Sequence, residues 1–520
     1  MRGAVAAGHP LTAQAGARIL EQGGNAVDAC IAAGFVSWVT ESPLTGPGAG
    51  GFMLVHRASD KSDRLLDFFV SIPGRGLDDV APAAMDEIEV PFDEHTLQLF
   101  RIGGPSCAVP GTVAGLGEAH RLYGTLAWHE LVGPAVETAR AGVALNPQQA
   151  FLHKILDVAL RAEDEGRRIY GAQAPLGTGK RIVMDDLAET LELLGQEGAA
   201  AFYRGRLARA ISTAVRERGG VLTEEDLADY RVIRRRPVRV PYLGHEFVSN
   251  PPPSSGGVLI AFALRILDRL GSPGPPGSAP ALAALTEVMR EATLARGGTF
   301  LSALYRGGLA DRLLADTRVE EATLRARSRG PAVAREPAGA PSTTHISAVD
   351  AAGNAASLSA STGCGSGVIV PGTGIQLNNM LGETDLNAGE GRARPGRRLT
   401  SMMAPSIVLR GGRPRLVVGS AGSVRLRAAI LQIVVNVVAH GMRVNDAIAA
   451  PRIHLEGEHL NLEGGVDARV ADELEAAGYD IVRWSDLNLY FGGASAVALA
   501  DGALEAAGDP RRGGAGVVVT

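Results

Sequence analysis

Three consecutive residues in the second half of the chain, Thr343, Thr344 and His345, carry groups that could take part in covalent catalysis. A threonine hydroxyl is a weak nucleophile unless a nearby base removes its proton. A free α-amino group, with a reference pKa of about 7.7–8.0, can be that base within the same residue when the threonine begins a chain. Thr343 could then be both nucleophile and base, although an isolated Thr-Thr-His triplet is usually ordinary strand composition.

A β-hairpin is the element expected to position this triplet. From Thr344 to Asp350, successive side chains fall on two alternating faces, as in a strand. The chain should turn at 351–354 and return as a second strand at 355–361. His345 shares the parity of Thr343 and could point toward the same site, but the α-amino group already fills the role of base, which favours a structural role for His345.

The segment before the triplet, 327–342, contains prolines and glycines without a periodic pattern and is interpreted as a surface linker. Elsewhere, residues 10–40 predict two helices broken at Gly23-Gly24, and 113–218 predict a mostly helical region. Residues 232–248 predict strands broken at Pro237, Pro241 and Gly244, followed by an apolar helix that ends at Leu270.

Six short motifs follow one another along the chain: GPGAGGFMLV at 46–55, PGTVAGL at 110–116, PPPSSGG at 251–257, the Thr-Thr-His stretch, LTSMMAPSIV at 399–408 and GSAGS at 419–423. With these motifs in this order, the chain resembles the gamma-glutamyltranspeptidase (glutathione hydrolase) family. Members of that family are made as precursors and cut themselves immediately before the first Thr of a Thr-Thr-His triplet.

The resemblance implies cleavage between Ser342 and Thr343, giving a large subunit 1–342 and a small subunit 343–520 that begins with the catalytic Thr343. The two fragments would form a heterodimer and share one composite domain, with further oligomerisation left open. The implied fold is an α/β (α+β) four-layer αββα sandwich of the N-terminal-nucleophile hydrolase type. Strands at 343–361 would pair with strands of the large fragment.

Three further catalytic residues follow from the motif match. Gly422 and Ser423 correspond to the family's paired oxyanion-hole donors, and they precede an apolar helix whose dipole would support that role. Ser361 corresponds to the residue whose hydroxyl assists the nucleophile. The alternatives are a helix-entry glycine at 422, an N-cap at 423 and an ordinary strand serine at 361.

Substrate-binding positions match the family less well. Typical members hold the α-carboxylate of a γ-glutamyl group with an Arg, because a guanidinium matches a carboxylate. Here that position is Phe69, which cannot form the ion pair. The usual Asn, Gln and Asp around the α-amino group are replaced by Gly363, Met380 and Glu383, whereas Thr400-Ser401 retains the character of the family's Ser-Ser pair.

Arg394, Arg397 or Arg398 could replace the missing carboxylate anchor, although solvation at the surface is the favoured role of each. About 15 residues separate Glu383 from Leu399, fewer than in the segment that forms a lid in many relatives. We therefore expect an open, less polar pocket.

The sequence leaves three functions open. The first is a self-processing γ-glutamyl hydrolase or transferase that works through a Thr343 acyl-enzyme. The second is an N-acyl amidohydrolase, such as a glutaryl or cephalosporin-type acylase, that lacks γ-glutamyl specificity. The third is an unprocessed, non-catalytic homologue. The physiological acyl donor and acceptor do not follow from the residues.

Composition argues against several other classes. The 520 residues contain 51 basic and 56 acidic side chains, a net charge of −5 without the signature of nucleic-acid binding. Cys30, Cys107 and Cys364 show no metal or disulfide pattern. The glycines at 46–51 follow a helix and precede a strand, the reverse of a dinucleotide-binding loop. We expect no metal, no cofactor, no membrane span and a cytoplasmic location, since the first residues lack a secretory apolar segment.

Overall fold

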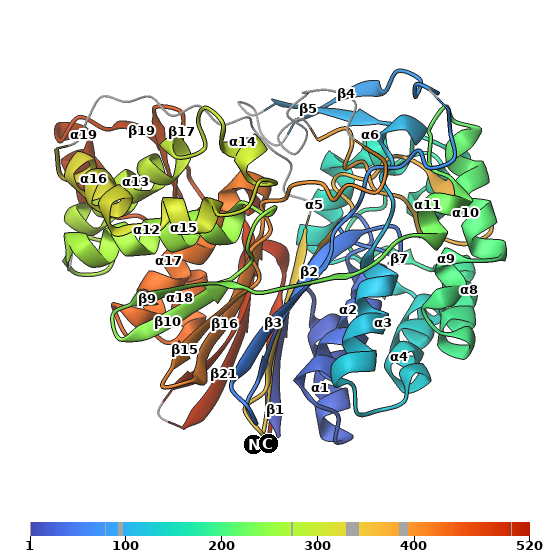
Figure 1. Cartoon of the computed structure of the whole chain (residues 1–520), viewed down its shortest axis with the longest axis horizontal. Helices are drawn as coiled ribbons and strands as arrows, with labels where there is room; N and C mark the ends of the chain where they lie inside the picture. Colours follow the sequence, from blue (N-terminus) through green and yellow to red (C-terminus); the bar gives the residue numbers. More distant parts are fainter. Residues whose placement is uncertain are drawn as a thin grey trace.

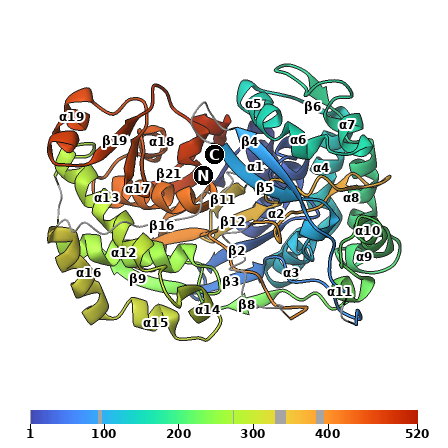
Figure 2. The same cartoon turned by 90° about the horizontal axis from the view of Figure 1, so that it is seen from above.

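Two β-sheets pack face to face and are covered on their outer sides by helices, which gives four layers in the order αββα (Figure 1). The computed structural model describes residues 2–78, 80–91, 97–271, 274–328, 343–383, 394–500 and 502–520. Seen from above, both sheets run through the middle of the molecule between the two groups of helices (Figure 2). The predicted αββα sandwich is confirmed.

The first sheet has seven strands, and neighbouring strands in it are antiparallel. Their order is β22 (Ala515–Val519), β1 (Gly3–Ala7), β11 (Thr344–Asp350), β12 (Ala355–Ser361), β2 (Gly50–Arg57), β3 (Ser62–Phe68) and β8 (Ile233–Arg235). The predicted hairpin is therefore confirmed as β11 and β12. It also pairs as predicted with strands from the first part of the chain, β11 with β1 and β12 with β2.

The second sheet has six strands. Their order is β21 (Ala503–Gly508), β20 (Gly493–Ala500), β16 (Arg413–Ala421), β15 (Ser406–Arg410), β10 (His245–Ser249) and β9 (Val238–Tyr242). Shorter strand pairs and a small three-stranded sheet lie outside both: β4 (Asp86–Pro91) with β5 (Leu97–Ile102), β6 (Val143–Ala144) with β7 (Arg181–Ile182), β13 (Ile369–Val370) with β14 (Ile375–Gln376), and β17 (Ile453–Glu456), β18 (His459–Leu462) and β19 (Asp480–Arg483).

One helical layer covers the seven-stranded sheet. It includes α1 (Pro10–Glu21), α2 (Ala26–Thr40), α3 (Thr112–Tyr123), α4 (Trp128–Ala141), α5 (Pro147–Ile155), α6 (Asp157–Leu160), α7 (Asp164–Tyr170), α8 (Asp185–Glu197), α9 (Ala200–Tyr203), α10 (Arg206–Arg216) and α11 (Glu224–Ala228). The regions 10–40 and 113–218, which contain most of these helices, were predicted as helical. Asn25 begins α2 with a capping box, in which its side chain accepts from Asp28 N, while Asp28 accepts from Asn25 N.

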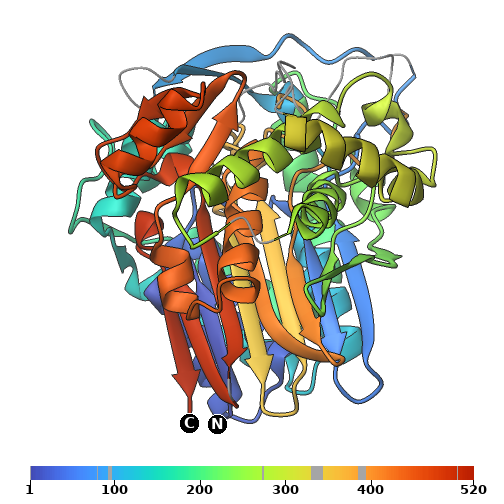
Figure 3. The same cartoon turned by 90° about the vertical axis from the view of Figure 1, so that its left-hand side faces the viewer.

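The second helical layer covers the six-stranded sheet (Figure 3). It includes α12 (Gly256–Leu270), α13 (Ala279–Leu294), α14 (Phe300–Ala303), α15 (Leu309–Leu313), α16 (Asp316–Ser328), α17 (Leu426–Val438), α18 (Val444–Ala449) and α19 (Ala468–Ala476). A large apolar cluster extends from these helices into the space between the sheets, where it includes Phe52, Leu54 and Phe69. A second cluster fills the space between the seven-stranded sheet and its own helices.

Two predicted boundaries differ from the structure. The helix α16 continues to Ser328, two residues into the predicted linker, and the rest of that linker, with Ser342, lies outside the described residues. Pro241 does not break a strand but lies inside β9, opposite Glu246. The strand tolerates this proline because β9 is at the edge of its sheet, where a missing N–H costs no ladder hydrogen bond.

The two chain ends lie side by side. Arg2 N donates to Val519 O at 2.8 Å, and β1 and β22 pair from Gly3 opposite Val519 to Ala7 opposite Ala515. The N and C labels in Figure 1 accordingly fall together at one end of the sandwich.

Candidate active site

Thr343 lies immediately before β11 and is buried, with 5% of its surface exposed. The hairpin pairs Thr344 with Ala360, so continuing the register by one position places Ser361 across from Thr343. Ser361 in turn pairs with Gly50 on β2. Thr343 and Ser361, both predicted as catalytic, are therefore neighbours at the same end of the hairpin.

The side chain of Thr343 is directed between the two sheets. The hydroxyl of Thr344 donates to Glu41 Oε2 at 2.6 Å, on the side of the helices α1 and α2. The next side chain, His345, packs in the opposite direction against Gly419 of the second sheet. Because side chains alternate along a strand, Thr343 shares the direction of His345.

Contacts between the sheets show which ends meet. His345 packs on Gly419, whereas Ser357, farther from Thr343, donates to Val418 O at 3.4 Å. Hairpin residues farther from Thr343 therefore face residues of β16 with lower numbers, and hairpin residues nearer to Thr343 face the C-terminal end of β16. The Thr343 end of the hairpin lies at the same end of the sandwich as Gly422 and Ser423, which follow β16.

His345 has the surroundings of a packing residue. Its ring nitrogens interact with Ser359 Oγ at 2.8 Å and Ser347 Oγ at 3.0 Å. Burial lowers the pKa of His345 from 6.5 to about 3, so the imidazole is neutral at physiological pH. This arrangement supports the structural role favoured from the sequence.

Gly422 and Ser423 form the turn between β16 and α17. Gly422 has a φ of 123° and Ser423 a φ of 53°, a conformation that is unfavourable for a non-glycine residue and is often retained at functional sites. Ser423 does not cap α17, because the N-cap residue of that helix is Arg425. The alternative of an N-cap at 423 is thus wrong, while the oxyanion role of both residues stays a prediction.

Gly363 and Glu383, two of the substrate-binding candidates, lie together. A β-carbon on Gly363 would collide with Asn379 Oδ1 and would stand 3.0 Å from Glu383 Oε1. Gly363 N donates to Ser361 Oγ at 3.0 Å, which links this group to the hairpin. Asn379 was missed from the sequence, and its buried Oδ1 has no hydrogen-bond partner among the residues that the structure describes.

Phe69 and Met380 belong to the apolar cluster between the sheets. Phe69 is 1% exposed and stacks on Phe52 with ring centroids 5.5 Å apart. Tyr230 donates its hydroxyl to Phe69 O at 2.7 Å, which fixes the main chain there. At the position where the family has its carboxylate-binding Arg, this chain therefore has a buried, tightly packed phenylalanine.

Arg398 corrects an expectation. Arg394 and Arg397 are exposed, but Arg398 is buried, donates to Phe69 O and forms an ion pair with Asp67 Oδ1 at 3.2 Å. It is not a solvated surface residue. Its guanidinium also lies 4.8 Å from the centroid of the Tyr230 ring, and both side chains donate to Phe69 O.

Thr400 and Ser401 are buried where two of the sequence motifs meet. Ser401 Oγ accepts from Met403 N at 3.0 Å, and Ser401 O accepts from the hydroxyls of Ser254 at 3.0 Å and Ser255 at 3.1 Å. Two serines of the PPPSSGG motif thus bind the main chain of the LTSMMAPSIV motif. The substrate contact assigned to Thr400 and Ser401 stays a prediction.

Two charged residues near Thr343 were missed from the sequence. Arg512 donates from Nη1 to Thr343 O at 2.9 Å, and Glu41 accepts from Thr344. Burial raises the pKa of Glu41 from 4.5 to about 7, and burial lowers the pKa of Arg512 from 12.5 to about 10.

Other kinds of site find no support in the described part of the chain. It holds no group of three or more His, Cys, Asp or Glu residues arranged for a metal ion. The three cysteines are buried thiols. Within the same residues, no helix has both the length and the apolar character needed to cross a membrane.

Comparisons with known proteins identify the family of the chain. The family model for Gamma-glutamyltranspeptidase matches residues 12–519. The chain is 34% identical over 536 residues to the acylase ACY 1 proenzyme of Pseudomonas sp. (strain SE83), covering 100% of this chain and 94% of that protein. It is 33% identical over 546 residues to the glutathione hydrolase proenzyme of Pseudomonas aeruginosa, covering 99% and 94%. Among solved structures, the cephalosporin acylase from Bacillus halodurans matches with a TM-score of 0.83 and 27% identity, covering 99% of this chain and 95% of that one.

Proposed function

The chain belongs to the gamma-glutamyltranspeptidase family, and on that premise we propose that it is a self-processing N-acyl amidohydrolase whose acyl pocket does not select an amino-acid head group. Its relatives and its fold make it an enzyme of the N-terminal-nucleophile hydrolase type. Acylases and glutathione hydrolases both occur among those relatives, so the acyl group has to be argued from the site itself.

The proposed reaction begins after the bond between Ser342 and Thr343 is cut. The new α-amino group of Thr343 takes the proton from its hydroxyl, and Oγ1 attacks the carbonyl carbon of the substrate amide. The N–H groups of Gly422 and Ser423 stabilise the oxyanion that forms. The amine leaves with the transferred proton, and water then hydrolyses the ester on Thr343, releasing the acid and restoring the free hydroxyl.

The observation that carries the choice of acyl group is Phe69. A γ-glutamyl donor brings a carboxylate that needs a cation in the pocket. The residue at the family's Arg position is instead stacked on Phe52 within an apolar cluster that includes Met380. Arg398, a buried cation at Phe69, is already bonded to Asp67 and to the main chain of Phe69. An uncharged acyl chain fits this surface better than a zwitterionic head group.

A second candidate, γ-glutamyl hydrolysis or transfer, is favoured by one different observation. Glu383 places a carboxylate beside Gly363, and both positions match the family's binding groups for an α-amino group. A carboxylate there could still attract the ammonium of a γ-glutamyl donor.

Turnover of three anilides separates the two candidates. Purified protein should run as two bands on a denaturing gel, and the Thr343→Ala variant as one band. We expect kcat/KM for the hexanoyl anilide to exceed that for the γ-glutamyl anilide at least tenfold, with the glutaryl anilide, which carries one carboxylate, between them. Preference for the γ-glutamyl compound would support the second candidate instead. A wild-type chain that stays uncut and inactive would contradict both and leave the non-catalytic homologue.

A further inference from the structure

Thr343 and Thr344 are each bonded to a charged residue that the catalytic scheme above does not use. Arg512 Nη1 donates to the main-chain carbonyl of Thr343 at 2.9 Å. The side-chain hydroxyl of Thr344 donates to Glu41 Oε2 at 2.6 Å. Because consecutive side chains of a strand point in opposite directions, fixing Thr344 toward Glu41 fixes Thr343 toward the space between the sheets.

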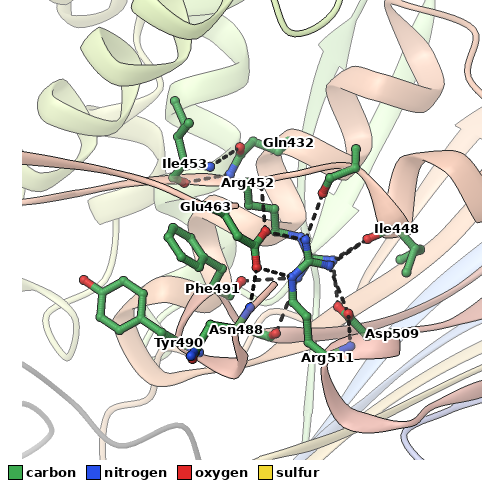
Figure 4. Close-up of polar contacts among 12 residues, drawn as sticks. Gln432, Ile448, Arg452, Ile453, Glu463, Asn488, Tyr490, Phe491, Asp509 and Arg511 are labelled. Atoms are coloured by element: carbon green, nitrogen blue, oxygen red, sulfur yellow. Dashed lines mark hydrogen bonds and ion pairs between the residues drawn. The ribbon is translucent and has the colours of Figure 1, made fainter. Parts of the chain in front are cut away.

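The residue before Arg512 belongs to a buried ion-pair network. Arg511, the preceding residue, lies between the carboxylates of Glu463 and Asp509, and its side chain is completely buried (Figure 4). Asp509 also pairs with Arg452 at 2.7 Å. Two guanidinium groups and two carboxylates therefore balance one another in the core, which avoids an uncompensated buried charge.

The same network reaches the turn that precedes β20. Arg452, labelled in Figure 4, donates from Nη1 to Phe491 O at 3.2 Å. Asp509 Oδ2 accepts from Ala494 N at 2.8 Å. Arg512 passes over Gly493 so closely that a β-carbon at Gly493 would collide with its side chain. The network therefore fixes both the 491–494 segment and the path of Arg512.

The 491–494 segment also touches the predicted oxyanion turn. A β-carbon on Gly422 would stand 3.1 Å from the Cα atom of Gly492. One continuous set of contacts thus runs from the carbonyl of Thr343 to Arg512, from Arg512 to Gly493, and from the adjacent Gly492 to Gly422. A rigid connection of this kind keeps a nucleophile and its oxyanion donors at a constant separation.

Glu41 completes the arrangement from the helical side. Its carboxylate is buried against Gly8, where a β-carbon would collide with it, and it accepts from Thr12 Oγ1 at 3.4 Å. Its charge attracts that of Arg512, and this attraction opposes the effect of burial on the pKa of each group. The two residues bond to adjacent positions of the chain, Thr343 and Thr344, and form one electrostatic pair.

We propose that Arg512 and Glu41 are positioning residues that clamp the Thr343–Thr344 segment, one through the Thr343 carbonyl and one through the Thr344 hydroxyl, and aim the Thr343 hydroxyl at the Gly422 turn. The clamp rests on the proposed function only in taking Thr343 as the nucleophile, and it does not depend on the acyl group. Loosening it should reduce the fraction of bound substrate in attack geometry, and hence kcat, while leaving KM nearly unchanged.

Four variants test the clamp: Arg512→Met, Arg512→Lys, Glu41→Gln and the control Arg415→Met. Arg415 makes the same kind of contact, from Nη1 to Leu499 O at 3.0 Å, but on β16 near the other end of the sheet. Each variant is assayed for thermal unfolding, for the time course of two-band formation, and for kcat and KM with the anilide that the wild type cleaves fastest.

We expect Arg512→Met to slow processing and to lower kcat at least tenfold, with KM within threefold of wild type. Arg512→Lys should recover part of the loss, and Arg415→Met should behave as wild type. Glu41→Gln, which keeps an acceptor for Thr344, should lower kcat less than Arg512→Met does. If Arg512→Met does not fold, Arg512→Lys and Glu41→Gln test the clamp in its place. A kcat at least threefold below that of the wild type, with unchanged KM, in either of these two variants then supports the clamp.

Wild-type kcat in folded Arg512→Met, or in both Arg512→Lys and Glu41→Gln, would overturn the clamp. An equal loss in Arg415→Met would do so as well, since the effect would then be general. These results differ from failure of the proposed function, in which the wild type itself shows no processing and no anilide turnover, and Thr343→Ala changes nothing.

Discussion

The imidazole ring of His345 occupies the space that a β-carbon on Gly419 would need. This contact joins the strand that starts after Thr343 to the strand that ends before Gly422. The separation of the two sheets at the active end therefore depends on the absence of a side chain at Gly419.

Replacing Gly419 with Ala should push the two sheets apart. The His345 ring is also held by Ser347 and Ser359 and has little room to move. Overpacking of a core typically costs about 1–3 kcal/mol. We expect urea unfolding of Gly419→Ala to show a loss of that size, together with slower formation of the two fragments. Gly411→Ala is the control for processing. Gly411 lies in a turn where an added β-carbon meets no other atom, although its φ of 60° causes mild strain. Wild-type processing in Gly419→Ala would contradict the prediction.

Replacing Phe69 with Arg should change which substrates are preferred. The guanidinium would be buried in the apolar cluster without a partner, which costs several kcal/mol unless a carboxylate pairs with it. We expect a lower Tm, a higher kcat/KM for γ-glutamyl and glutaryl anilides, and a lower one for the hexanoyl anilide. The control Phe69→Met, which stays apolar, should keep the wild-type order. An unchanged order in Phe69→Arg would mean that Phe69 does not line the acyl pocket.

Removing the guanidinium of Arg398 should destabilise the fold without changing substrate preference. Asp67 is completely buried and would keep only its ion pair with Arg235, at 2.7 Å. Losing one partner of a buried ion pair typically costs about 3–5 kcal/mol. We expect Arg398→Met to lose about 3 kcal/mol in urea unfolding, measured in the uncut Thr343→Ala background. The exposed neighbour Arg397→Met should lose far less. Similar losses in both variants, or a selective loss with charged anilides, would contradict this assignment.

The raised pKa of Glu41, about 7 against a usual 4.5, predicts a pH-dependent stability. Between these values the folded state keeps a proton that the unfolded state releases. The stabilising contribution is therefore complete below about pH 4.5 and is lost as the pH rises through about 7. Relative to its parent, Glu41→Gln should gain on the order of 2 kcal/mol between pH 5 and pH 8.

Unfolding curves at several pH values, again in the Thr343→Ala background, measure this difference. The exposed Glu137→Gln serves as the matched control and should run parallel to its parent at every pH, since its pair with Arg18 is largely solvated. Parallel curves for Glu41→Gln would show that Glu41 does not titrate in this range.

Sequence reasoning succeeded where the pattern is local. The β11–β12 hairpin follows from alternation within a few residues, and the α1–α2 break follows from Gly23-Gly24. The motif match added the αββα layering, which no local pattern contains. Pro241 was misinterpreted because a proline breaks a central strand but not an edge strand, and edge position is a property of the whole sheet.

The site could be predicted only in part for a related reason. Glu41 and Arg512 contact the Thr343–Thr344 segment across 303 and 169 positions of sequence, and neither is in one of the motifs. Arg398 was expected to be solvated at the surface, yet it contacts Tyr230 and Asp67, which come from distant segments. Tertiary contacts between remote segments leave no local signal.

The pairing of β1 with β22 suggests a different way to build this enzyme. Because the two chain ends are hydrogen-bonded neighbours, a short Gly-Ser bridge could join them without disturbing the sheet. The chain could then be opened at the other end of the sandwich, so that synthesis begins at Thr343 and finishes at 342. In such a circular permutant, removal of the initiator methionine would leave Thr343 as the first residue. Catalysis would then no longer depend on self-cleavage.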